Sequence, residues 1–475
     1  RLFDETQLMT LSNEELTSIY HFPNTNLNTP RVRIAKSASS EPPADLPKEG
    51  LVIGTNVYRG DERKVRLSRE DRRRHLYIIG QTGTGKSTLI KNMIVQDIRN
   101  GEGVGILDPH GDIAEDVSAL VPQNRINDVV VVDPSDLSRP IALNMLEFNP
   151  NFPEQKTFIV NEIINILDKL YDLKATGGPM FEQYTRNALL LLMDYPERGF
   201  TLLEIPRVLS DKTFRTELLS GCKNILVKDF WEKEADKAGG EAALANMVPY
   251  ITSKFNVFLA NDYIRPIISQ SKSTINFREI LDSKKILIVN LTKGRLGDIN
   301  ASLLGLIIVG KILMAAFSRV DTVEDKRSDF YLYMDEFQNF ATDSIATILS
   351  EARKYRLNLI IAHQFIEQLK KEIKDAVFGN VGSVLALRVG TEDAKILVNQ
   401  FDPVFNENDL VNIDNFNAYV KMLISGRTSK PFSIRVDKTE KGDPILAAEI
   451  KKTSSSKYGR DRDEVEADIF RRIKR

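Results

Sequence analysis

Short runs of apolar residues alternate with segments of helical spacing along much of the chain. In the first part of this pattern, apolar runs at 76–79, 104–107 and 129–132 are separated by helical segments at 86–100 and 112–120. Strands that are apolar on both faces and separated by helices are typical of a parallel sheet covered by helices on both sides. The pattern therefore predicts an α/β fold.

Strand signals nearly vanish from about residue 151 to residue 282. Helical spacing dominates there, over 158–171, 181–193 and 229–258, and glycine-rich stretches at 177–179 and 239–240 are interpreted as breaks between helices. We interpret this part as an all-α insertion in the α/β core. Alternation then resumes, with predicted strands at 285–291, 330–334, 357–362 and 384–388 and predicted helices at 299–317, 344–355 and 392–401.

The ends of the core carry β patterns of another kind. Two short runs at 51–58 and 64–67 predict a hairpin, and runs at 418–424 and 431–436 predict a closing β pair.

Outside these runs, residues 37–50 have the composition of a linker, and the tail from Lys438 is charged, with one short helix predicted at 463–473. We divide the chain into an N-terminal extension (1–50), a first core part (51–150), the insertion (151–282), a second core part (283–437) and a charged tail (438–475).

Composition is that of an ordinary globular protein. The 475 residues are 42% hydrophobic and 28% charged, enough for about two to four domains. The net charge of −1 gives no overall basic field, so any DNA contact requires local patches. Cys222 is the only cysteine, which excludes intrachain disulfides and favours a reducing compartment, and no zinc site is expected.

The most apolar predicted helix, 303–317, is shorter than the about 20 residues that a bilayer span requires. It also contains Lys311. This segment suits a buried core helix, so no membrane span is predicted.

One motif gives the most specific chemical information. Residues 80–87 read Gly-Gln-Thr-Gly-Thr-Gly-Lys-Ser, directly after the apolar run 75–79 and at the start of a helical segment. This setting of strand, loop and helix identifies the phosphate-binding loop of a P-loop NTPase. Its glycines let backbone N–H groups face phosphate oxygens, and the start of the helix adds its positive dipole end.

The residue types assign ligands within this loop. Lys86 reaches the β- and γ-phosphates of ATP, and the hydroxyl of Ser87 suits Mg²⁺. The predicted ATP contacts are Gly80, Thr82, Gly83, Thr84, Gly85, Lys86, Ser87 and Thr88.

A second motif supplies the acids that an ATPase of this kind needs. The predicted strand 330–334 ends in Asp335 and Glu336. One acid holds the Mg²⁺ shell and a second orients the attacking water, so we assign Asp335 to the metal and Glu336 to the water. The alternative is a solvated strand end. A small-molecule kinase needs no water-activating glutamate, so the pair favours ATP hydrolysis.

Two further catalytic candidates follow the acids. Gln364 ends the next predicted strand, where an amide can contact both γ-phosphate and water and so report hydrolysis. Arg353 lies at the end of the intervening helix and is a candidate arginine finger acting across a subunit boundary. A basic last turn, favoured by the helix dipole, is the alternative for Arg353.

Other charged residues are weaker candidates. Asp108 follows the second core strand and is a candidate ligand of the Mg²⁺ shell. His110, two residues later, is a candidate for a contact with phosphate or with a neighbouring subunit. Lys293 and Arg295 lie in a basic, glycine-flanked loop that either follows nucleic-acid phosphates or is an ordinary turn. The cluster 69–74 is interpreted as a solvated face, with a subunit contact as the alternative.

The order of these motifs resembles that of a known superfamily. The phosphate loop, Asp-Pro-His-Gly-Asp at 108–112, the helical insertion, the acids at 335–336, Arg-Lys-Tyr at 353–355 and Gln364 occur in the order found in the HerA/FtsK superfamily of ring-shaped DNA-pumping ATPases. Over residues 51–436 the chain looks most like the TraG/TraD-type coupling proteins of conjugation and type IV secretion and their DUF87-type relatives.

The resemblance implies a RecA-like core, a hexamer with ATP sites between subunits, and DNA passing through a central channel without sequence recognition. It implies the roles given above for Lys86, Ser87, Asp335, Glu336 and Gln364, and a trans-acting role for Arg353. It also implies a cytoplasmic prokaryotic protein that contacts membrane-associated secretion machinery, with any inner-membrane tether in a segment outside this chain. Neither the N-terminal transmembrane helices of coupling proteins nor a HerA-type N-terminal barrel is evident, which leaves the subfamily open.

Three functions therefore stay open. The leading hypothesis is a DNA-translocating ATPase motor. The second is an ATPase of the same fold that energises protein transfer in a secretion system. The third is a nucleotide-switched assembly module with little turnover, which the presence of Glu336 disfavours.

Overall fold

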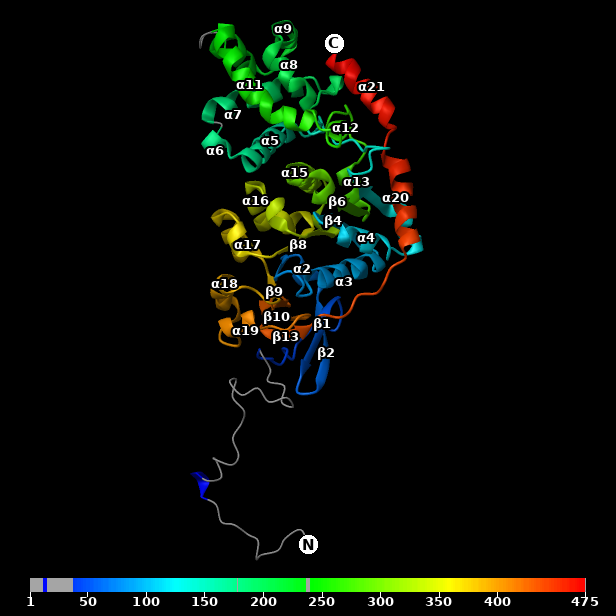
Figure 1. The fold of residues 1–475 in the computed structure, drawn as a ribbon, viewed down its shortest axis with the longest axis vertical. Helices are drawn as coiled ribbons and strands as arrows, with labels where there is room; N and C mark the ends of the chain where they lie inside the picture. The colour runs from blue at the N-terminus through cyan, green and yellow to red at the C-terminus, as the bar shows by residue number, and fades with distance from the viewer. Residues whose placement is uncertain (1–11, 15–36, 177, 236–239, 475) are drawn as a thin grey trace, which may run out of the picture.

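An 11-stranded sheet runs through the middle of the molecule (Figure 1). The computed structural model describes residues 12–14, 37–176, 178–235 and 240–474. In spatial order the strands are β2 (Asp61–Leu67), β1 (Leu51–Tyr58), β13 (Phe432–Arg435), β10 (Asn417–Lys421), β9 (Ser383–Ala386), β3 (Leu76–Ile79), β8 (Leu357–His363), β7 (Phe330–Met334), β4 (Gly103–Asp108), β6 (Ile286–Asn290) and β5 (Val129–Val132).

The sheet has a parallel and an antiparallel part. All strands from β9 to β5 pair in parallel. At the other end, β10, β13, β1 and β2 pair antiparallel, so the predicted hairpin and closing β pair extend the same sheet. β11 (Leu423–Ile424) and β12 (Arg427–Thr428) form a small separate ribbon. The expected mainly parallel α/β fold is confirmed.

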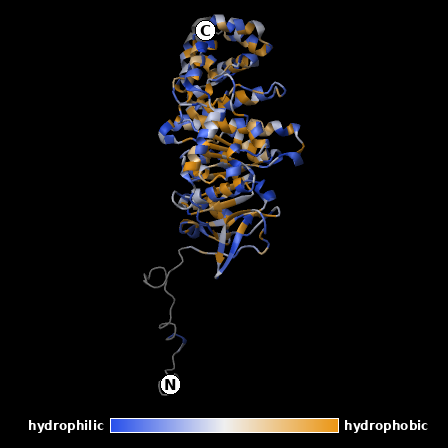
Figure 2. Cartoon of the chain, turned by 90° about the vertical axis from the view of Figure 1, so that its right-hand side faces the viewer, coloured by the Kyte–Doolittle hydropathy of each residue, from blue (hydrophilic) through white to orange (hydrophobic). Residues whose placement is uncertain are grey.

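Alternate residues of the central strands enter two different hydrophobic cores. In β3, Tyr77 and Ile79 belong to one core, whereas Leu76 and Ile78 belong to the other. Both sets are buried because helices cover both faces of the sheet, which explains why these strands are continuously apolar in the sequence. Figure 2 shows the apolar strands enclosed between more polar outer layers.

Two groups of helices cover the sheet. On the face with Leu76 lie α3 (Lys86–Arg99) and α4 (Asp112–Ser118). On the face with Tyr77 lie α15 (Asp298–Phe317), α16 (Asp343–Glu351), α17 (Lys371–Asn380) and α18 (Thr391–Phe401). Two further short helices, α14 (Lys293–Leu296) and α19 (Glu407–Val411), lie in connections at the ends of strands.

A helical insertion separates β5 from β6, although these two strands are neighbours in the sheet. All described secondary-structure elements of residues 133–285 are helices. Most of the insertion lies beyond one end of the sheet (Figure 1). Its helices are α5 (Gln155–Tyr171), α6 (Leu173–Thr176), α7 (Gly178–Met193), α8 (Ile205–Ser210), α9 (Lys212–Gly221), α10 (Ile225–Asp229), α11 (Gly240–Leu259), α12 (Arg265–Ile268) and α13 (Phe277–Asp282). The all-α character expected for this part is confirmed.

The C-terminal tail is more ordered than its composition predicts. It forms α20 (Pro444–Tyr458), which the sequence pattern did not predict, and α21 (Arg462–Ile473). The two helices run along one side of the molecule from the sheet to the insertion (Figure 1). Ser454 accepts a hydrogen bond from Val131 N of edge strand β5 at 2.7 Å. Contact with the sheet edge, rather than a strong apolar stripe, therefore stabilises α20.

The N-terminal linker also docks on the protein. Ala38 N donates to Asp409, and the Tyr419 hydroxyl donates to the Ala38 carbonyl at 2.8 Å. Residues 37–50 thus line the antiparallel end of the sheet. Most of the remaining predicted extension, residues 1–36, lies outside the described residues.

The helix α15 is the one described helix that is long and apolar enough to cross a membrane by length and composition. Within the protein, 72% of its most apolar window is buried. Burial between the sheet and the insertion accounts for this apolar composition, as expected for a core helix.

The cluster at 69–74 is only partly a solvated face: Arg69, Glu70 and Arg74 are exposed, whereas Arg72 forms a buried ion pair. Arg72, in α2 (Arg69–Arg72), donates two hydrogen bonds to Asp97 of α3, at 2.8 and 2.6 Å, and one to the Tyr333 hydroxyl of β7. Its guanidinium carbon lies 3.6 Å from the centre of the Tyr331 ring. Because Arg72 and Asp97 are both buried, each neutralises a charge that would otherwise be costly inside the protein.

We expect Arg72→Met to lower the free energy of unfolding by about 3–5 kcal/mol, because it leaves the charge of Asp97 buried without its cationic partner. Urea denaturation measures this loss. The double variant Arg72→Met/Asp97→Leu should be less destabilised than Arg72→Met alone. The matched control is Arg435→Met, whose pair with Glu62 is solvent-exposed and should change stability by less than about 1 kcal/mol. Equal losses in Arg72→Met and Arg435→Met would contradict the account.

Candidate functional site

The phosphate loop connects β3 to α3 in a conformation that depends on glycine. Gly83 and Gly85 have φ angles of +78° and +113°, which other residues rarely adopt. The buried Thr84 hydroxyl donates to the Gln81 carbonyl at 2.7 Å and closes the turn. The loop therefore directs its backbone N–H groups and the first turn of α3 to the carboxyl edge of the parallel sheet.

The two acids predicted at the end of β7 reach this loop. Lys86 Nζ lies 2.8 Å from Glu336 Oε1 and 3.3 Å from Asp335 Oδ1, and all three side chains are buried. The contact joins residues 250 positions apart in the chain. The sheet order β3-β8-β7 explains it, since parallel strands end at one edge and β8 alone separates the loop strand from the acid strand.

Gln364, which follows the intervening strand β8, fills the space between the two motifs. Its amide Nε2 donates to Glu336 Oε1 at 2.6 Å, and its Oε1 accepts from the Thr82 hydroxyl at 2.9 Å. We call Thr82, Lys86, Asp335, Glu336 and Gln364 the Lys86 cluster. The structure brings all five of these predicted residues into one hydrogen-bonded group.

Two residues beside Glu336 support it and were not predicted. Gln338 Nε2 donates to Glu336 Oε2 at 2.8 Å, and Asn339 Nδ2 donates to the Glu336 carbonyl at 3.0 Å. Their position directly after the acids was the available signal, but amides that follow a strand are common in any turn. Glu336 itself has φ 46° and ψ 48°. This left-handed conformation is strained for a non-glycine residue and directs the carboxylate back to Lys86.

The charges of the cluster set the pKa of each acid differently. Burial raises the pKa of Asp335, against the opposing effect of Lys86. Burial also acts to raise the pKa of Glu336, but Lys86 and hydrogen bonds from Gln338 and Gln364 outweigh it, so this pKa is lowered. Glu336 is therefore ionised at neutral pH.

His363, next to Gln364, is a neutral neighbour of the cluster. Burial, reinforced by the charge of Lys86, lowers its pKa to about 4. Its Nε2 lies 2.5 Å from the Tyr77 hydroxyl of β3. The pair holds the end of β8 against the strand that leads into the phosphate loop.

The chemistry of the cluster fits a magnesium nucleotide. Ser87 is exposed at the start of α3, where its hydroxyl is available, and Asp335 provides a carboxylate at the same edge of the sheet. Mg²⁺ takes few protein ligands and completes its shell with waters and phosphates, so one hydroxyl and one carboxylate suffice.

The carboxylate of Asp108 accepts hydrogen bonds from the backbone. Its two carboxylate oxygens accept from His110 N at 2.9 Å and from Ala114 N at 3.0 Å. Asp108 is fully buried and stabilises the turn into α4, whereas His110 is exposed. The geometry thus gives Asp108 a structural role and provides no contact that supports its proposed part in the Mg²⁺ shell.

The predicted basic loop is instead the one-turn helix α14. Lys293 Nζ contacts Asn339 Oδ1 and Asp298 Oδ1, both at 3.2 Å, and Arg295 donates to the Ser135 hydroxyl at 3.2 Å. Lys293 is therefore linked through Asn339 to the turn that holds Glu336. Arg295 is exposed.

Arg353 lies away from the cluster of its own chain. It is exposed in the turn η9 (Ala352–Tyr355), before the amino end of β8, whereas Gln364 follows the carboxyl end. The seven residues of β8 span roughly 23 Å, beyond the reach of an arginine side chain. Any contact of Arg353 with a nucleotide would have to be made in another subunit.

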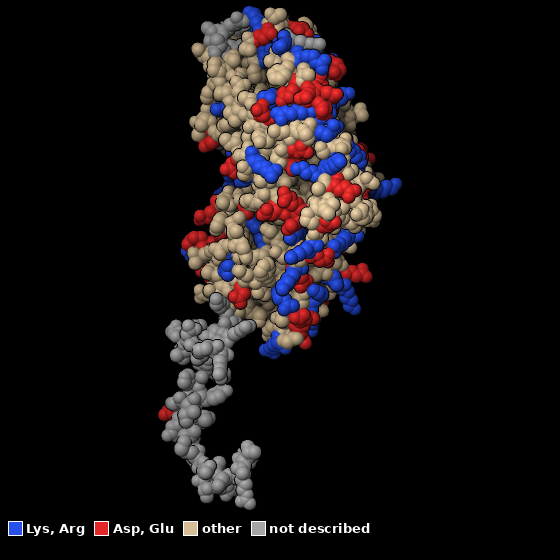
Figure 3. Space-filling view, turned by 45° about the vertical axis from the view of Figure 1, so that its right-hand side comes forward, with Lys and Arg blue, Asp and Glu red and all other residues tan. Residues whose placement is uncertain are grey.

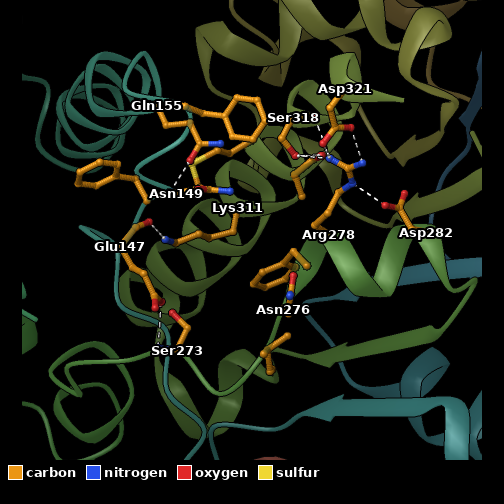
Figure 4. Close-up of a pocket in the computed structure, with 16 residues that line it drawn as sticks. Glu147, Asn149, Gln155, Ser273, Asn276, Arg278, Asp282, Lys311, Ser318 and Asp321 are labelled. Carbon is orange, nitrogen blue, oxygen red and sulfur yellow. Dashed lines mark hydrogen bonds and ion pairs between the residues drawn. The ribbon is translucent and has the colours of Figure 1, made fainter. Parts of the chain in front are cut away.

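A separate cavity of about 630 Å³ lies where the insertion meets α15. Figure 4 shows Lys311 pointing toward the Glu147 carbonyl, to which it donates at 2.9 Å, and Arg278 paired with Asp282 and Asp321. Burial lowers the pKa of Lys311 to about 8. None of the predicted site residues lines this cavity.

Comparison with known families agrees with the geometry. The family model of the central domain of helicase HerA matches residues 51–315, more than half of the chain. The chain belongs to this HerA central-domain family. A second model, the TraM recognition site of TraD and TraG, matches residues 329–397. The resemblance inferred from the order of the motifs is confirmed. None of the curated proteins compared with the chain matches it.

Solved structures of two other proteins share the fold of this HerA family member. The plasmid coupling protein TrwB in complex with ADP and Mg²⁺ has a TM-score of 0.58 at 14% identity, over 85% of this chain and 93% of that one. TrwB with the ATP analogue ADPNP has a TM-score of 0.56 at 16% identity, over 84% and 91%. VirB4 of Thermoanaerobacter pseudethanolicus has a TM-score of 0.52 at 16% identity, over 83% and 97%. At these identities the likeness concerns the fold alone.

We expect Lys86→Met to make stability depend on pH. Without the ammonium, the buried Asp335 and Glu336 face each other, and their pKa values rise above those of the unfolded chain. The folded state then binds more protons than the unfolded state, so stability falls as pH rises over roughly pH 4 to 8. The melting temperature of nucleotide-free protein, relative to wild type, should drop more at pH 8 than at pH 5.

The double variant Lys86→Met/Glu336→Gln removes one of the two carboxylates and should lose most of this pH dependence. A destabilisation by Lys86→Met that is equal at both pH values would show that the acids are not coupled to Lys86.

Proposed function

We propose that this chain is an ATP-hydrolysing motor of the HerA type that moves DNA. The observation that carries the proposal is the convergence of Lys86, Glu336 and Gln364 at the phosphate loop. A protein that only binds nucleotide needs the loop and its lysine. It does not need an ionised glutamate beside the site of the γ-phosphate, oriented by two amides.

In this proposal each residue of the cluster has one task. Lys86 binds the β- and γ-phosphates of ATP, and in doing so exchanges its contact with Glu336 for a contact with phosphate. Glu336, released from Lys86, accepts a proton from the attacking water and orients it. Gln364, which donates to Glu336, would also bond the γ-phosphate and so report whether that phosphate is present.

Mg²⁺, held by Ser87 and Asp335, would neutralise charge on the phosphates. The TrwB structures with ADP and Mg²⁺ and with ADPNP support ATP and Mg²⁺ as ligands of this chain by shared fold.

DNA is proposed as the substrate because the chain belongs to a helicase family. The face seen in Figure 3 carries Lys and Arg interspersed with Asp and Glu, so a single subunit presents no continuous basic surface there. A ring would instead collect a few cations from each subunit around a channel. Lys293 and Arg295 are the proposed contributors, of which Arg295 is the more exposed.

We propose a homo-oligomer, by family resemblance a hexamer, and the position of Arg353 supports this proposal. Arg353 is exposed at the sheet edge opposite to the Lys86 cluster. If it stabilises charge on the transferring phosphoryl group, it does so in the site of a neighbouring subunit. We propose a cytoplasmic location, next to membrane-associated secretion machinery.

A second function, ATP-driven protein transfer in a secretion system, is favoured by a different observation. Residues 329–397 match a model named for recognition of TraM, a protein partner. This segment includes the acids of the Lys86 cluster as well as Arg353 and Gln364. A partner bound there would contact the elements that carry the catalytic residues.

We expect Glu336→Gln to bind ATP within a few-fold of wild type and to reduce hydrolysis by about 100-fold or more, the usual effect of losing a general base. The measurements are binding of a fluorescent ATP analogue and phosphate release. Single- or double-stranded DNA should raise wild-type hydrolysis severalfold.

The matched control is Glu367→Gln, an exposed acid three residues after Gln364, which should behave as wild type. Hydrolysis that ignores DNA but responds to a partner protein would favour protein transfer. Tight ATP binding without hydrolysis by wild type would favour the assembly module.

Arg353→Ala should bind ATP but hydrolyse it at least about 10-fold more slowly than wild type. The matched control, Lys354→Ala, removes the neighbouring exposed cation and should hydrolyse ATP at the wild-type rate. A mixing experiment separates action within a subunit from action between subunits. Arg353→Ala subunits retain Glu336, and Glu336→Gln subunits retain Arg353. Mixed rings should therefore contain some complete sites and hydrolyse ATP faster than either variant alone. Absence of any such recovery would remove Arg353 from the neighbouring site.

A further inference from the structure

Phe416 combines exposure, backbone strain and contact with the phosphate loop. Its side chain is 46% exposed, although it lies in the connection that enters buried strand β10. Its φ angle is +61°. Bulky residues rarely adopt this left-handed conformation, and such strain persists only where the surrounding structure enforces it.

Backbone hydrogen bonds hold Phe416 in place. Phe416 N donates to the Thr84 carbonyl of the phosphate loop at 2.8 Å, and the Phe416 carbonyl accepts from Val436 N at 2.7 Å. The ring lies against the loop as well: a Cβ atom on Gly85 would be 3.0 Å from Phe416 Cδ1. The position of the ring is therefore fixed relative to the groups that face the phosphates.

The strand order gives the direction in which a nucleotide extends. In the order β10-β9-β3-β8-β7, the strands that carry Gln364 and Glu336 lie on one side of β3. Phe416 directly precedes β10, on the other side. A nucleotide with its γ-phosphate at Lys86 and Glu336 therefore extends its ribose and base away from β8, toward the side of Phe416.

We propose that Phe416 forms the platform on which the base of the bound nucleotide stacks. This inference rests on the proposed function, because it assumes that the phosphate loop binds a nucleoside triphosphate. An exposed aromatic ring attracts the flat face of any base. Because only the face of the base is recognised by this contact, its loss should weaken binding of ATP and GTP alike.

The test separates the base from the phosphates by using two probes. Binding of a non-hydrolysable ATP analogue and of inorganic triphosphate, each with Mg²⁺, is measured by calorimetry. Phe416→Ala should weaken binding of the nucleotide by roughly 10- to 100-fold, in line with the loss of one stacked base. Binding of inorganic triphosphate, which has no base, should change by less than about 2-fold.

Further variants distinguish stacking from loop support. Phe416→Leu keeps an apolar side chain against Gly85 but lacks an aromatic face, so it should behave like Phe416→Ala. Phe416→Tyr retains the face and should bind the nucleotide as wild type does. The matched control is Phe470→Ala, a residue that is 52% exposed in α21, which lies away from α3 and its phosphate loop (Figure 1). It should leave both affinities unchanged.

Each other outcome overturns the proposal. Equal weakening of both probes by Phe416→Ala would mean that Phe416 only supports the phosphate loop. Full nucleotide binding by both Phe416→Ala and Phe416→Leu would place the base elsewhere. Failure of the proposed function has a different signature, since wild-type protein would then bind neither probe or Lys86→Ala would not affect them.

Discussion

The buried contact of Lys86 with Glu336 and Asp335 is the interaction on which the site depends. An ammonium and two carboxylates are removed from water, which is tolerated only because they neutralise one another. Their pairing requires the phosphate loop and the end of β7 to meet at the same sheet edge, one strand apart. The geometry of the Lys86 cluster is thus set by the fold, and under the proposed function the phosphates of ATP compete with Glu336 for Lys86.

The elements that carry this contact are joined a second time. Helix α3 begins at Lys86 and bears Asp97 near its other end, and β7 leads to Asp335 and bears Tyr333. Asp97 accepts from the Tyr333 hydroxyl at 2.5 Å and from Arg72 at 2.6 Å. The helix and the strand are therefore fixed to each other at two separate points. A shift of β7 along the sheet would break both contacts, so the buried contacts of Asp97 with Tyr333 and Arg72 also protect the register of the acids.

Features specified by a few neighbouring residues could be predicted from the sequence, whereas features that depend on tertiary contacts could not. The glycine pattern around Lys86 and the apolar strand before Asp335 were predictable, because each is specified within a few residues. The burial of Arg72 was not predictable, because a run of arginines is usually solvated and its partner Asp97 lies on another element. Helix α20 lacks a clear apolar stripe and depends on the edge of β5. Phe416 was not predicted, since the bond from Phe416 N to the Thr84 carbonyl joins residues far apart in sequence.

Strand β8 gives the proposed oligomer a physical connection between sites. Arg353 lies just before its amino end, and Gln364 directly follows its carboxyl end. Each residue of β8 is buried. Neighbours β3 and β7 pair with β8 in parallel on both sides, so β8 is held by the sheet on both of its edges. Under the proposed function, the amide that contacts the γ-phosphate in one site is thus linked through a rigid strand to the arginine offered to the next. If the proposed ring hydrolyses ATP in a coordinated order, β8 would connect neighbouring sites without any additional domain.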